Sequence, residues 1–211
     1  MLGKIVEAFE LLYLHVAVKV YEGLQQRRVR KLFYHDRKFQ ALDQALLQGP
    51  NPFRLKEAFP YGETPLCSLK QIADRCGLKP EDKMVDLGCG RGRGVFFLAH
   101  HYGCQVHGID KMRDFIDQAS RLKEQYSVEN ASFLCEDLRN YDFSQATFVF
   151  FYGTIFSEEF VRELTEKLKV LPEGAKIITV SYPLEGFELK DQFPVSFSWG
   201  TGEVYYHLVS K

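Results

Sequence analysis

The sequence predicts an α/β fold, a doubly wound and mostly parallel seven-stranded sheet with an N-terminal helical extension. Three observations predict it. From residue 83 onward, apolar strand-like stretches alternate with helix-like stretches. A glycine-rich turn, Asp86-Leu87-Gly88-Cys89-Gly90-Arg91-Gly92, joins the first apolar stretch to a helix. Acidic residues follow the next two strands, at the edge where open sheets of this type bind ligands.

Residues 1–52 precede the predicted sheet and form a separate helical extension. A first helix is indicated by apolar residues at helical spacing, namely Ile5, Phe9, Leu12, Tyr13, Val16 and Val20. Glu7, Glu10 and Lys19 break any apolar run that would be long enough to span a membrane.

A basic run from Arg27 to Lys38 leads into a second predicted helix, Phe39 to Leu47, and Gly49-Pro50-Asn51-Pro52 reads as the linker to a domain of residues 53–211. The two helices either cap the sheet or act as a lid that contacts substrate, a partner chain or an anionic membrane surface. Deletion of residues 1–48 separates these alternatives, because a lid would affect turnover and leave cofactor affinity intact.

The strands are expected to begin near Lys83, Gln105, Ala131, Thr147, Lys176, Val195 and Glu203. Helices are predicted at Met112 to Tyr126 and at Ser157 to Lys169, the second with an N-cap serine followed by two acids. The short Tyr182 to Lys190 connection leaves a short helix or none before the sixth strand. Gly200 to Gly202 predicts the turn of a final hairpin, which makes one strand antiparallel.

The glycine-rich turn indicates the kind of ligand. Alternating glycines permit positive φ and remove the Cβ atoms that would keep a ligand away. A dinucleotide fingerprint requires glycine where Arg93 stands, and no Lys-Ser or Lys-Thr pair follows, so neither phosphate-binding pattern fits. Asp86, two residues before the first glycine, favours a ligand that carries positive charge and no phosphate. S-adenosylmethionine (SAM), with its ammonium and sulfonium groups, is such a ligand.

These residues resemble the class I SAM-dependent methyltransferases, which have a Rossmann-like fold. The first motif of that group is an acid followed by alternating glycines, matched by Asp86, Gly88, Gly90 and Gly92. The resemblance implies that Asp110, which ends the second predicted strand and precedes Lys111, binds the ribose hydroxyls. It also implies that Glu136 or Asp137, after the third strand, binds the adenine amine.

A narrower resemblance covers most of residues 58–209. Pro60-Tyr61-Gly62-Glu63-Thr64 and Val195-Ser196-Phe197-Ser198-Trp199-Gly200-Thr201-Gly202 look like segments of the disruptor-of-telomeric-silencing family of non-SET protein lysine methyltransferases. The resemblance implies that the first segment folds over SAM and that the final hairpin lies near a lysine channel. The family's asparagines after the fourth strand are absent here, because Phe151 is followed by Tyr152-Gly153-Thr154.

Together these patterns define a candidate site. The expected cofactor-binding residues are Tyr61, Glu63, Thr64, Asp86, Gly88, Cys89, Gly90, Gly92, Asp110, Lys111, Glu136 and Asp137. A lysine acceptor must be deprotonated before attack, which favours an aromatic channel that desolvates the ammonium. Candidates for its lining are Tyr152, Phe156, Trp199, Tyr205 and Tyr206, with Tyr152 as the candidate catalytic residue because it ends the fourth strand. Ordinary core packing also explains these aromatic residues.

Composition is consistent with one globular enzyme in the cytoplasm. The chain has 211 residues, a net charge of −1 and 45% hydrophobic residues, so it has enough apolar surface for a core and no bulk attraction to nucleic acid. Five cysteines without C-x-x-C spacing predict reduced thiols, and no metal site is expected.

Three functions remain: SAM-dependent methyl transfer to a protein, expected at a lysine amine; the same transfer to a small molecule or RNA; and SAM binding without turnover. The absence of an Asn/Asp-Pro-Pro-aromatic motif after the fourth strand argues against adenine or glutamine acceptors. The partners expected are the methyl acceptor and, through the N-terminal helix, a membrane surface, with an oligomer left open.

Overall fold

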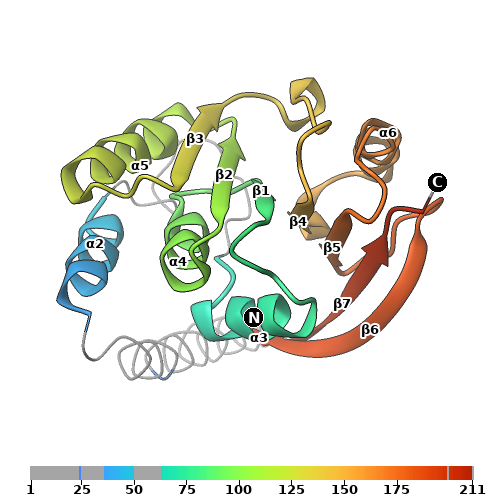
Figure 1. The fold of residues 1–211 in the computed structure, drawn as a ribbon, viewed down its shortest axis with the longest axis horizontal. Coiled ribbons are helices and arrows are strands. Elements are labelled where there is room, and N and C mark those ends of the chain that lie inside the picture. The colour runs from blue at the N-terminus through green and yellow to red at the C-terminus, as the bar shows by residue number, and fades with distance from the viewer. Residues whose placement is uncertain (1–23, 25–35, 50–62, 199, 211) are drawn as a thin grey trace, which may run out of the picture.

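The computed structural model describes residue 24 and residues 36–49, 63–198 and 200–210. Its centre is a seven-stranded sheet with the order β3-β2-β1-β4-β5-β7-β6 (Figure 1). The strands are β1 (Lys83–Leu87), β2 (Gln105–Asp110), β3 (Ala131–Cys135), β4 (Phe148–Tyr152), β5 (Lys176–Val180), β6 (Glu188–Phe197) and β7 (Gly200–Leu208). Strands β1 to β5 pair in parallel, whereas β7 is antiparallel to both of its neighbours. This confirms the predicted mostly parallel, doubly wound sheet.

Helices cover both faces of the sheet, as its parallel strands require. One face packs against α2 (Arg37–Leu47), α3 (Leu66–Arg75), α4 (Arg93–Tyr102) and α5 (Arg113–Tyr126) through the larger of two hydrophobic clusters. The other face packs against α6 (Glu158–Leu168) and the short 3-10 helix η2 (Leu138–Asn140) through the second cluster. A second short 3-10 helix, η3 (Gly153–Ile155), follows β4 directly.

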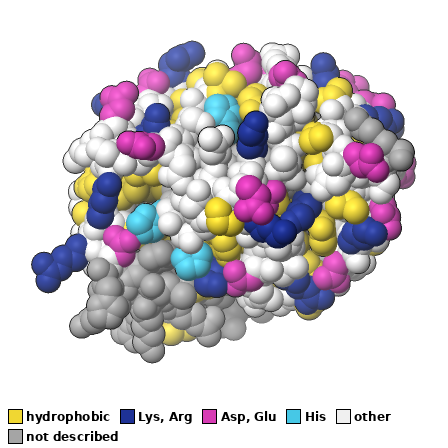
Figure 2. All heavy atoms as spheres, in the orientation of Figure 1, with side chains coloured by type: hydrophobic (Ala, Val, Ile, Leu, Met, Phe, Trp, Pro, Cys, Tyr) yellow, Lys and Arg dark blue, Asp and Glu magenta, His cyan; other side chains and the backbone are white. Residues whose placement is uncertain are grey.

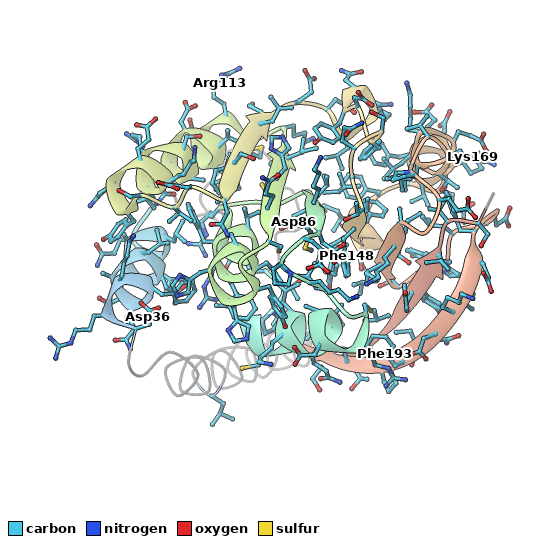
Figure 3. The ribbon with its side chains drawn as sticks, viewed as in Figure 1. Asp36, Asp86, Arg113, Phe148, Lys169 and Phe193 are labelled. Carbon is cyan, nitrogen blue, oxygen red and sulfur yellow. The ribbon has the colours of Figure 1, made fainter. Side chains whose placement is uncertain are left out.

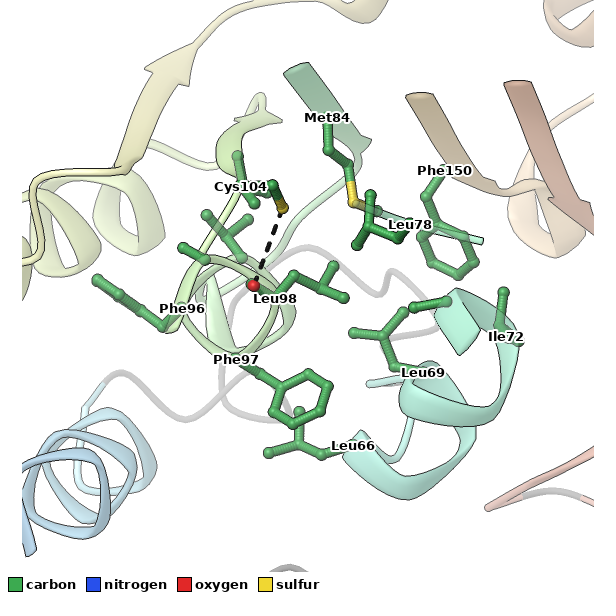
Figure 4. Close-up of a cluster of buried hydrophobic side chains, with 14 of the residues drawn as sticks. Leu66, Leu69, Ile72, Leu78, Met84, Phe96, Phe97, Leu98, Cys104 and Phe150 are labelled. Carbon is green, nitrogen blue, oxygen red and sulfur yellow. Dashed lines mark hydrogen bonds between the residues drawn. The ribbon is translucent and has the colours of Figure 1, made fainter. Parts of the chain in front are cut away.

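The larger cluster fixes the position of the glycine-rich turn. Leu69 and Ile72 of α3 and Phe97 of α4 project into one apolar layer beside Met84 of β1 and Phe150 of β4 (Figure 4). Burial of each such side chain stabilises the fold by roughly 1.5–3 kcal/mol. Because β1 and α4 are both held in this layer, the turn that joins them has two rigid ends.

Helix α2, predicted at Phe39 to Leu47, forms and docks on α4 and α5. The Asp36 carboxylate caps it by accepting a hydrogen bond of 2.8 Å from the backbone N–H of Phe39, and it also contacts Nε2 of His100. The Phe39 ring stacks on His100 at a centroid distance of 5.2 Å and meets Phe97 edge-on. The helix predicted before it and the linker residues from Pro50 onward lie outside the described residues.

The C-terminal hairpin is longer than predicted. Strand β6 begins at Glu188, not near Val195, because it is an edge strand whose first half carries mostly exposed polar side chains and shows no apolar period. The Gly200 to Gly202 stretch is part of β7, not the turn, since Gly200 already pairs with Phe197. The pairing of β6 with β7 is interrupted by a register shift between Leu189 and Asp191, and β6 also contains a proline, at position 194. As predicted, no helix forms in residues 181–187 between β5 and β6.

Three further features bear on the chemistry of the chain. All five cysteines are free thiols; Cys76 and Cys104 are buried and the other three partly buried. In the part of the chain that the structure describes, no helix has the length and apolar character needed to cross a membrane. Within the same residues, no three His, Cys, Asp or Glu side chains gather as metal ligands would.

Candidate cofactor and acceptor site

The glycine-rich turn connects β1 to α4. Gly88, Gly90 and Gly92 have φ values of 82°, 54° and 77°, in the left-handed region that favours glycine. The backbone N–H groups of Gly88 and Cys89 both donate to the carbonyl oxygen of Ile109, at 2.9 and 3.0 Å, and tie the turn to β2. Among the described residues, no atom lies within 4 Å of a Cβ atom added at Gly88, so the turn borders open space there. A ligand can therefore approach the backbone closely.

The side chain of Cys89 points into the sheet. A Cβ atom added at Gly108 of β2 would lie 2.8 Å from Sγ of Cys89 and 2.7 Å from Cγ2 of Val95, so only glycine leaves room for this packing. Burial raises the pKa of the Cys89 thiol well above its usual range. The thiol therefore stays protonated and has a packing role. Gly108 was not predicted, although a glycine inside a strand signals a close approach.

Two carboxylates lie beside the turn. Asp110 ends β2, where Oδ2 accepts a hydrogen bond from the N–H of Gly90 and Oδ1 accepts one from the N–H of Met112, both at 2.8 Å. Each of these oxygens keeps a lone pair for a ligand hydroxyl. Asp86 of β1 is only 8% exposed, and within the described residues no group donates a hydrogen bond to its carboxylate.

The surroundings of Asp86 suit a cation. The residue lies in the interior, whereas Arg113 and Lys169 reach the surface (Figure 3). Burial, together with the nearby charge of Asp110, raises the pKa of Asp86 to about 7. A positive group beside it would restore the ionised form, because an opposite charge favours the charged state of an acid.

The two acids after β3 are already hydrogen-bonded. The Asp137 carboxylate accepts hydrogen bonds from the backbone N–H of Arg139, at 2.9 Å, and from Nη2 of Arg139, at 2.7 Å. The side-chain hydrogen bonds from Arg139 lower the pKa of Asp137 to about 2. Oε1 of Glu136 accepts from Nδ2 of Asn140 at 3.0 Å. The backbone N–H of Glu136 donates to the carbonyl of Asp110 at 3.1 Å, so these acids lie at the same edge as Asp110.

Lys111, the residue after Asp110, lies at this edge too, and its carbonyl oxygen is 3.6 Å from Sγ of Cys135. Thr64 is partly buried just before α3. Tyr61 lies outside the described residues.

Glu63 belongs to a set of four charged residues that was not predicted as a unit; we call Asp43, Glu63, Arg91 and Arg93 the arginine network. Glu63 lies 2.6 Å from Nη2 of Arg91 and 3.9 Å from Nη1 of Arg93. Asp43 of α2 accepts two hydrogen bonds from Arg93, at 2.6 and 3.0 Å. Arg91 also donates to the carbonyl of Leu46, at 3.4 Å. The arginine network therefore joins α2 and the segment before α3 to the glycine-rich turn.

The candidate channel residues divide between the two faces of the sheet. Tyr152 ends β4 on the face of the larger cluster, with its ring edge-on to Phe197 at 5.6 Å. Phe156 lies on the opposite face, stacked on Phe160 at 4.5 Å.

Tyr205 and Tyr206 are consecutive in β7 and so point to opposite faces. Tyr206 packs against the larger cluster. Tyr205 lies beside His207 on the other face, because Nε2 of His207 accepts a hydrogen bond from the N–H of Leu184, a member of the second cluster. Trp199 lies outside the described residues. The structure thus brings Tyr152 together with Phe197 and does not bring all the candidates into one channel. Two hydroxyl side chains at the same edge, Thr154 and Ser181, were also not predicted.

Charges of both signs are interspersed on the face shown in Figure 2, where no broad basic surface is visible. This agrees with the net charge of −1.

Residues 86–191, half of the chain, match the family of the ANTKMT methyltransferase domain. The chain is 26% identical over 174 residues to a histone-lysine N-methyltransferase, H3 lysine-79 specific, from Dictyostelium discoideum, a match that covers 66% of this chain and 9% of that protein. It is 27% identical over 124 residues to phosphoethanolamine N-methyltransferase 1 from Zea mays, covering 54% of this chain and 23% of that protein. The chain thus spans less than a quarter of either relative.

A crystal structure of an RNA methyltransferase from Salinibacter ruber in complex with S-adenosyl-L-homocysteine shares the fold, with a TM-score of 0.61 and 21% identity over 71% of this chain and 94% of that chain. With the glycine-rich turn and the strand-end acids described above, the family match identifies the class. The chain belongs to the ANTKMT methyltransferase domain family, within the class I SAM-dependent methyltransferases, whose cofactor is S-adenosylmethionine.

Proposed function

We propose that the glycine-rich turn and the strand-end acids hold SAM as the sequence predicts. The buried Asp86 carboxylate binds the ammonium of the methionine portion, because no described residue satisfies it. Asp110 accepts from the ribose hydroxyls with its remaining lone pairs, and Glu136 or Asp137 accepts from the adenine amine. Gly88, Gly90 and Gly92 give the methionine portion access to the backbone.

SAM supplies a methyl group that its sulfonium charge has already activated. The protein therefore contributes mainly proximity and orientation, which are worth roughly 7–11 kcal/mol in well-aligned reactions. Tyr61, Glu63 and Thr64 remain candidates to close over the cofactor. Glu63 acts on the cofactor site through Arg91 of the glycine-rich turn, with which it forms an ion pair.

We further propose that the acceptor is a lysine amine of a protein. The observation that carries this proposal is the aromatic pair of Tyr152 and Phe197 at the carboxyl end of β4, beside the turn. An apolar wall disfavours a charged ammonium and lowers the pKa of a lysine that enters, so that more of it is the neutral nucleophile. The similarity to a histone-lysine methyltransferase supports the same acceptor.

The test is a transfer assay with radiolabelled SAM and two lysates, one untreated and one whose lysine amines have been acylated. We expect acid-stable label in protein, recovered as methyl-lysine after hydrolysis and lost in the acylated lysate. Label that persists in acylated protein would contradict a lysine acceptor. Asp110→Ala is the control for cofactor dependence, and Tyr152→Phe shows whether the tyrosine hydroxyl contributes.

A small amine is the second candidate acceptor, favoured by the similarity to a phosphoethanolamine N-methyltransferase. Methyl transfer to a small amine requires the same neutral nitrogen nucleophile but no surface that binds another protein. In the same assay, label confined to the low-molecular-weight fraction would select it. SAM binding without transfer to any fraction would instead indicate a non-catalytic module.

A further inference from the structure

We propose that the hydroxyl groups of Thr154 and Ser181, at the ends of β4 and β5, accept hydrogen bonds from the amine that receives the methyl group. We call these two side chains the hydroxyl pair. The inference rests on the proposed amine acceptor and assigns the residues that orient it.

The hydroxyl pair joins the carboxyl ends of two adjacent strands. Thr154 lies in η3 directly after β4, and Ser181 directly follows β5. Tyr152 and Val180, which end these strands, are paired in register. The two Oγ atoms are 2.8 Å apart, and either can be the donor. Thr154 is exposed and Ser181 partly buried, so an acceptor can reach both.

The backbone at Ser181 is unusual. Its φ is 77°, a value that residues other than glycine rarely adopt. The other described non-glycine residue with positive φ, Ser127, is the C-cap of α5, where that conformation is common. Ser181 ends no helix, so helix termination does not explain its conformation.

Hydrogen bonds on both sides maintain this conformation. The N–H of Ser181 donates to the carbonyl of Glu203 in β7 at 2.9 Å, and the Thr179 hydroxyl donates to the carbonyl of Tyr182 at 2.5 Å. Strained backbone persists only where its surroundings enforce it, and it is concentrated at functional sites. Here the strained residue is the one whose hydroxyl meets Thr154.

The hydroxyl pair lies on the side of the cofactor site where the methyl acceptor is expected to bind. Open sheets bind their ligands beyond the carboxyl ends of the strands, at the point where the strand order reverses. In this sheet that point lies between β1, which leads into the glycine-rich turn, and β4. The hydroxyl pair lies at the ends of β4 and β5, on the side of the turn away from Asp110 and β2.

The chemistry of the hydroxyl pair suits an amine. One hydroxyl hydrogen forms the hydrogen bond between the two oxygens. The oxygens keep lone pairs that can accept hydrogen bonds from amine N–H groups. The lone pair of the amine nitrogen forms the new C–N bond as the C–S bond breaks. Sulfur keeps the electron pair, and the surplus proton leaves to water. The hydroxyl pair takes no proton; it orients the nitrogen.

Binding of two ligands tests the assignment without any acceptor. Sinefungin replaces the methyl-bearing sulfonium of SAM with a carbon that bears an amine, and so presents N–H donors where the methyl group stands. S-adenosylhomocysteine has no such amine. Calorimetric titration of the full chain with each ligand therefore isolates contacts to that amine.

We expect Thr154→Val to weaken sinefungin binding about tenfold, as the loss of one hydrogen bond to a charged group implies, with S-adenosylhomocysteine affinity unchanged. Ser181→Gly, which tolerates the positive φ and lacks the hydroxyl, should act in the same direction. Thr154→Ser should restore wild-type affinity. Melting curves confirm that each variant is folded.

Unchanged sinefungin affinity in folded Thr154→Val, or an equal loss for both ligands, would overturn the role of the hydroxyl pair and leave the proposed function standing. Failure of the wild type to bind either ligand would overturn the proposed cofactor site and this inference with it.

Discussion

At the scale of single residues, Asp86 couples cofactor binding to a proton. Its pKa of about 7 means that much of the cofactor-free protein carries a protonated carboxyl at neutral pH. An ammonium that binds there selects the ionised form. One linked proton of this pKa makes SAM affinity about tenfold weaker at pH 6 than at pH 8. Titration calorimetry across this range should show the dependence, and Asp86→Asn should abolish it.

The same group affects stability with the opposite sign. The folded-state pKa of Asp86 lies above its usual value of 3.8, so the folded protein binds the proton more tightly than the unfolded chain does. The stabilising contribution is complete below about pH 4 and is lost as the pH rises through about 7. For binding, the contrary outcome is clear: if the SAM affinity of the wild type does not change between pH 6 and pH 8, Asp86 does not contact the ammonium.

Substitution of Gly88 should affect SAM binding much more than the stability of the fold. Gly88→Ala places a Cβ where no atom of the described part of the chain lies within 4 Å, so its structural cost is the strain of a φ of 82°, about 1 kcal/mol. We expect this small loss of stability together with a large loss of SAM affinity, because the added methyl enters the proposed ligand space. Urea unfolding and calorimetry measure the two effects.

Gly103→Ala is the matched control. Gly103 has a φ of 71° and follows the end of α4 farthest from the turn; within the residues that the structure describes, an added Cβ there also has no atom within 4 Å. The same strain without any loss of SAM affinity is the expected result. Equal effects of the two variants on SAM affinity would argue against a ligand at Gly88.

At the scale of elements, the arginine network links α2 to the glycine-rich turn. The side chains of Asp43 and Arg93 are only 15% and 12% exposed, so removing one charge leaves the other poorly solvated. We expect Asp43→Asn to lower the free energy of unfolding by about 3 kcal/mol and to weaken SAM binding, because Arg93 begins α4 directly after the turn.

The exposed pair of Glu166 and Lys169 provides the comparison. These side chains are 68% and 51% exposed, and Glu166→Gln should change the free energy of unfolding by at most about 0.5 kcal/mol. Chemical denaturation of both variants measures the difference. If Asp43→Asn behaves like Glu166→Gln, α2 does not support the turn.

These elements also show what the sequence could predict. Strands β1, β2, β3 and β5 begin at the residues predicted, because each contains a short apolar stretch bounded by polar or turn-forming residues. The start of strand β6 was misplaced because its first half is mostly polar and exposed and contains no such stretch. Strand alternation alone separates Tyr205 from Tyr206, which the prediction of a single channel overlooked.

The site was predictable where its chemistry is local. An acid, alternating glycines and a strand-end Asp110 all appear in short stretches of sequence. The arginine network and the hydroxyl pair were not predictable, because Asp43 meets Arg93, and Thr154 meets Ser181, only after the chain has folded.

At the scale of the whole molecule, charge bears on the choice of acceptor. A net charge of −1, with both signs interspersed in Figure 2, provides little of the phosphate neutralisation that nucleic-acid binding requires. We expect no saturable binding of a labelled single-stranded RNA up to about 100 µM protein at physiological salt, the weak limit of non-specific binding. Anisotropy titration measures this, and tight, salt-dependent binding would favour an RNA acceptor.

The interrupted strand β6 has a consequence for self-association. An outer strand with free N–H and C=O groups is a template on which another copy can add a strand. Here the register shift between Leu189 and Asp191 bends the ladder, Pro194 has no N–H to offer, and Lys190 places a charge beside the shift. These are the devices by which edge strands resist intermolecular pairing. The sheet is therefore protected from extension past β6.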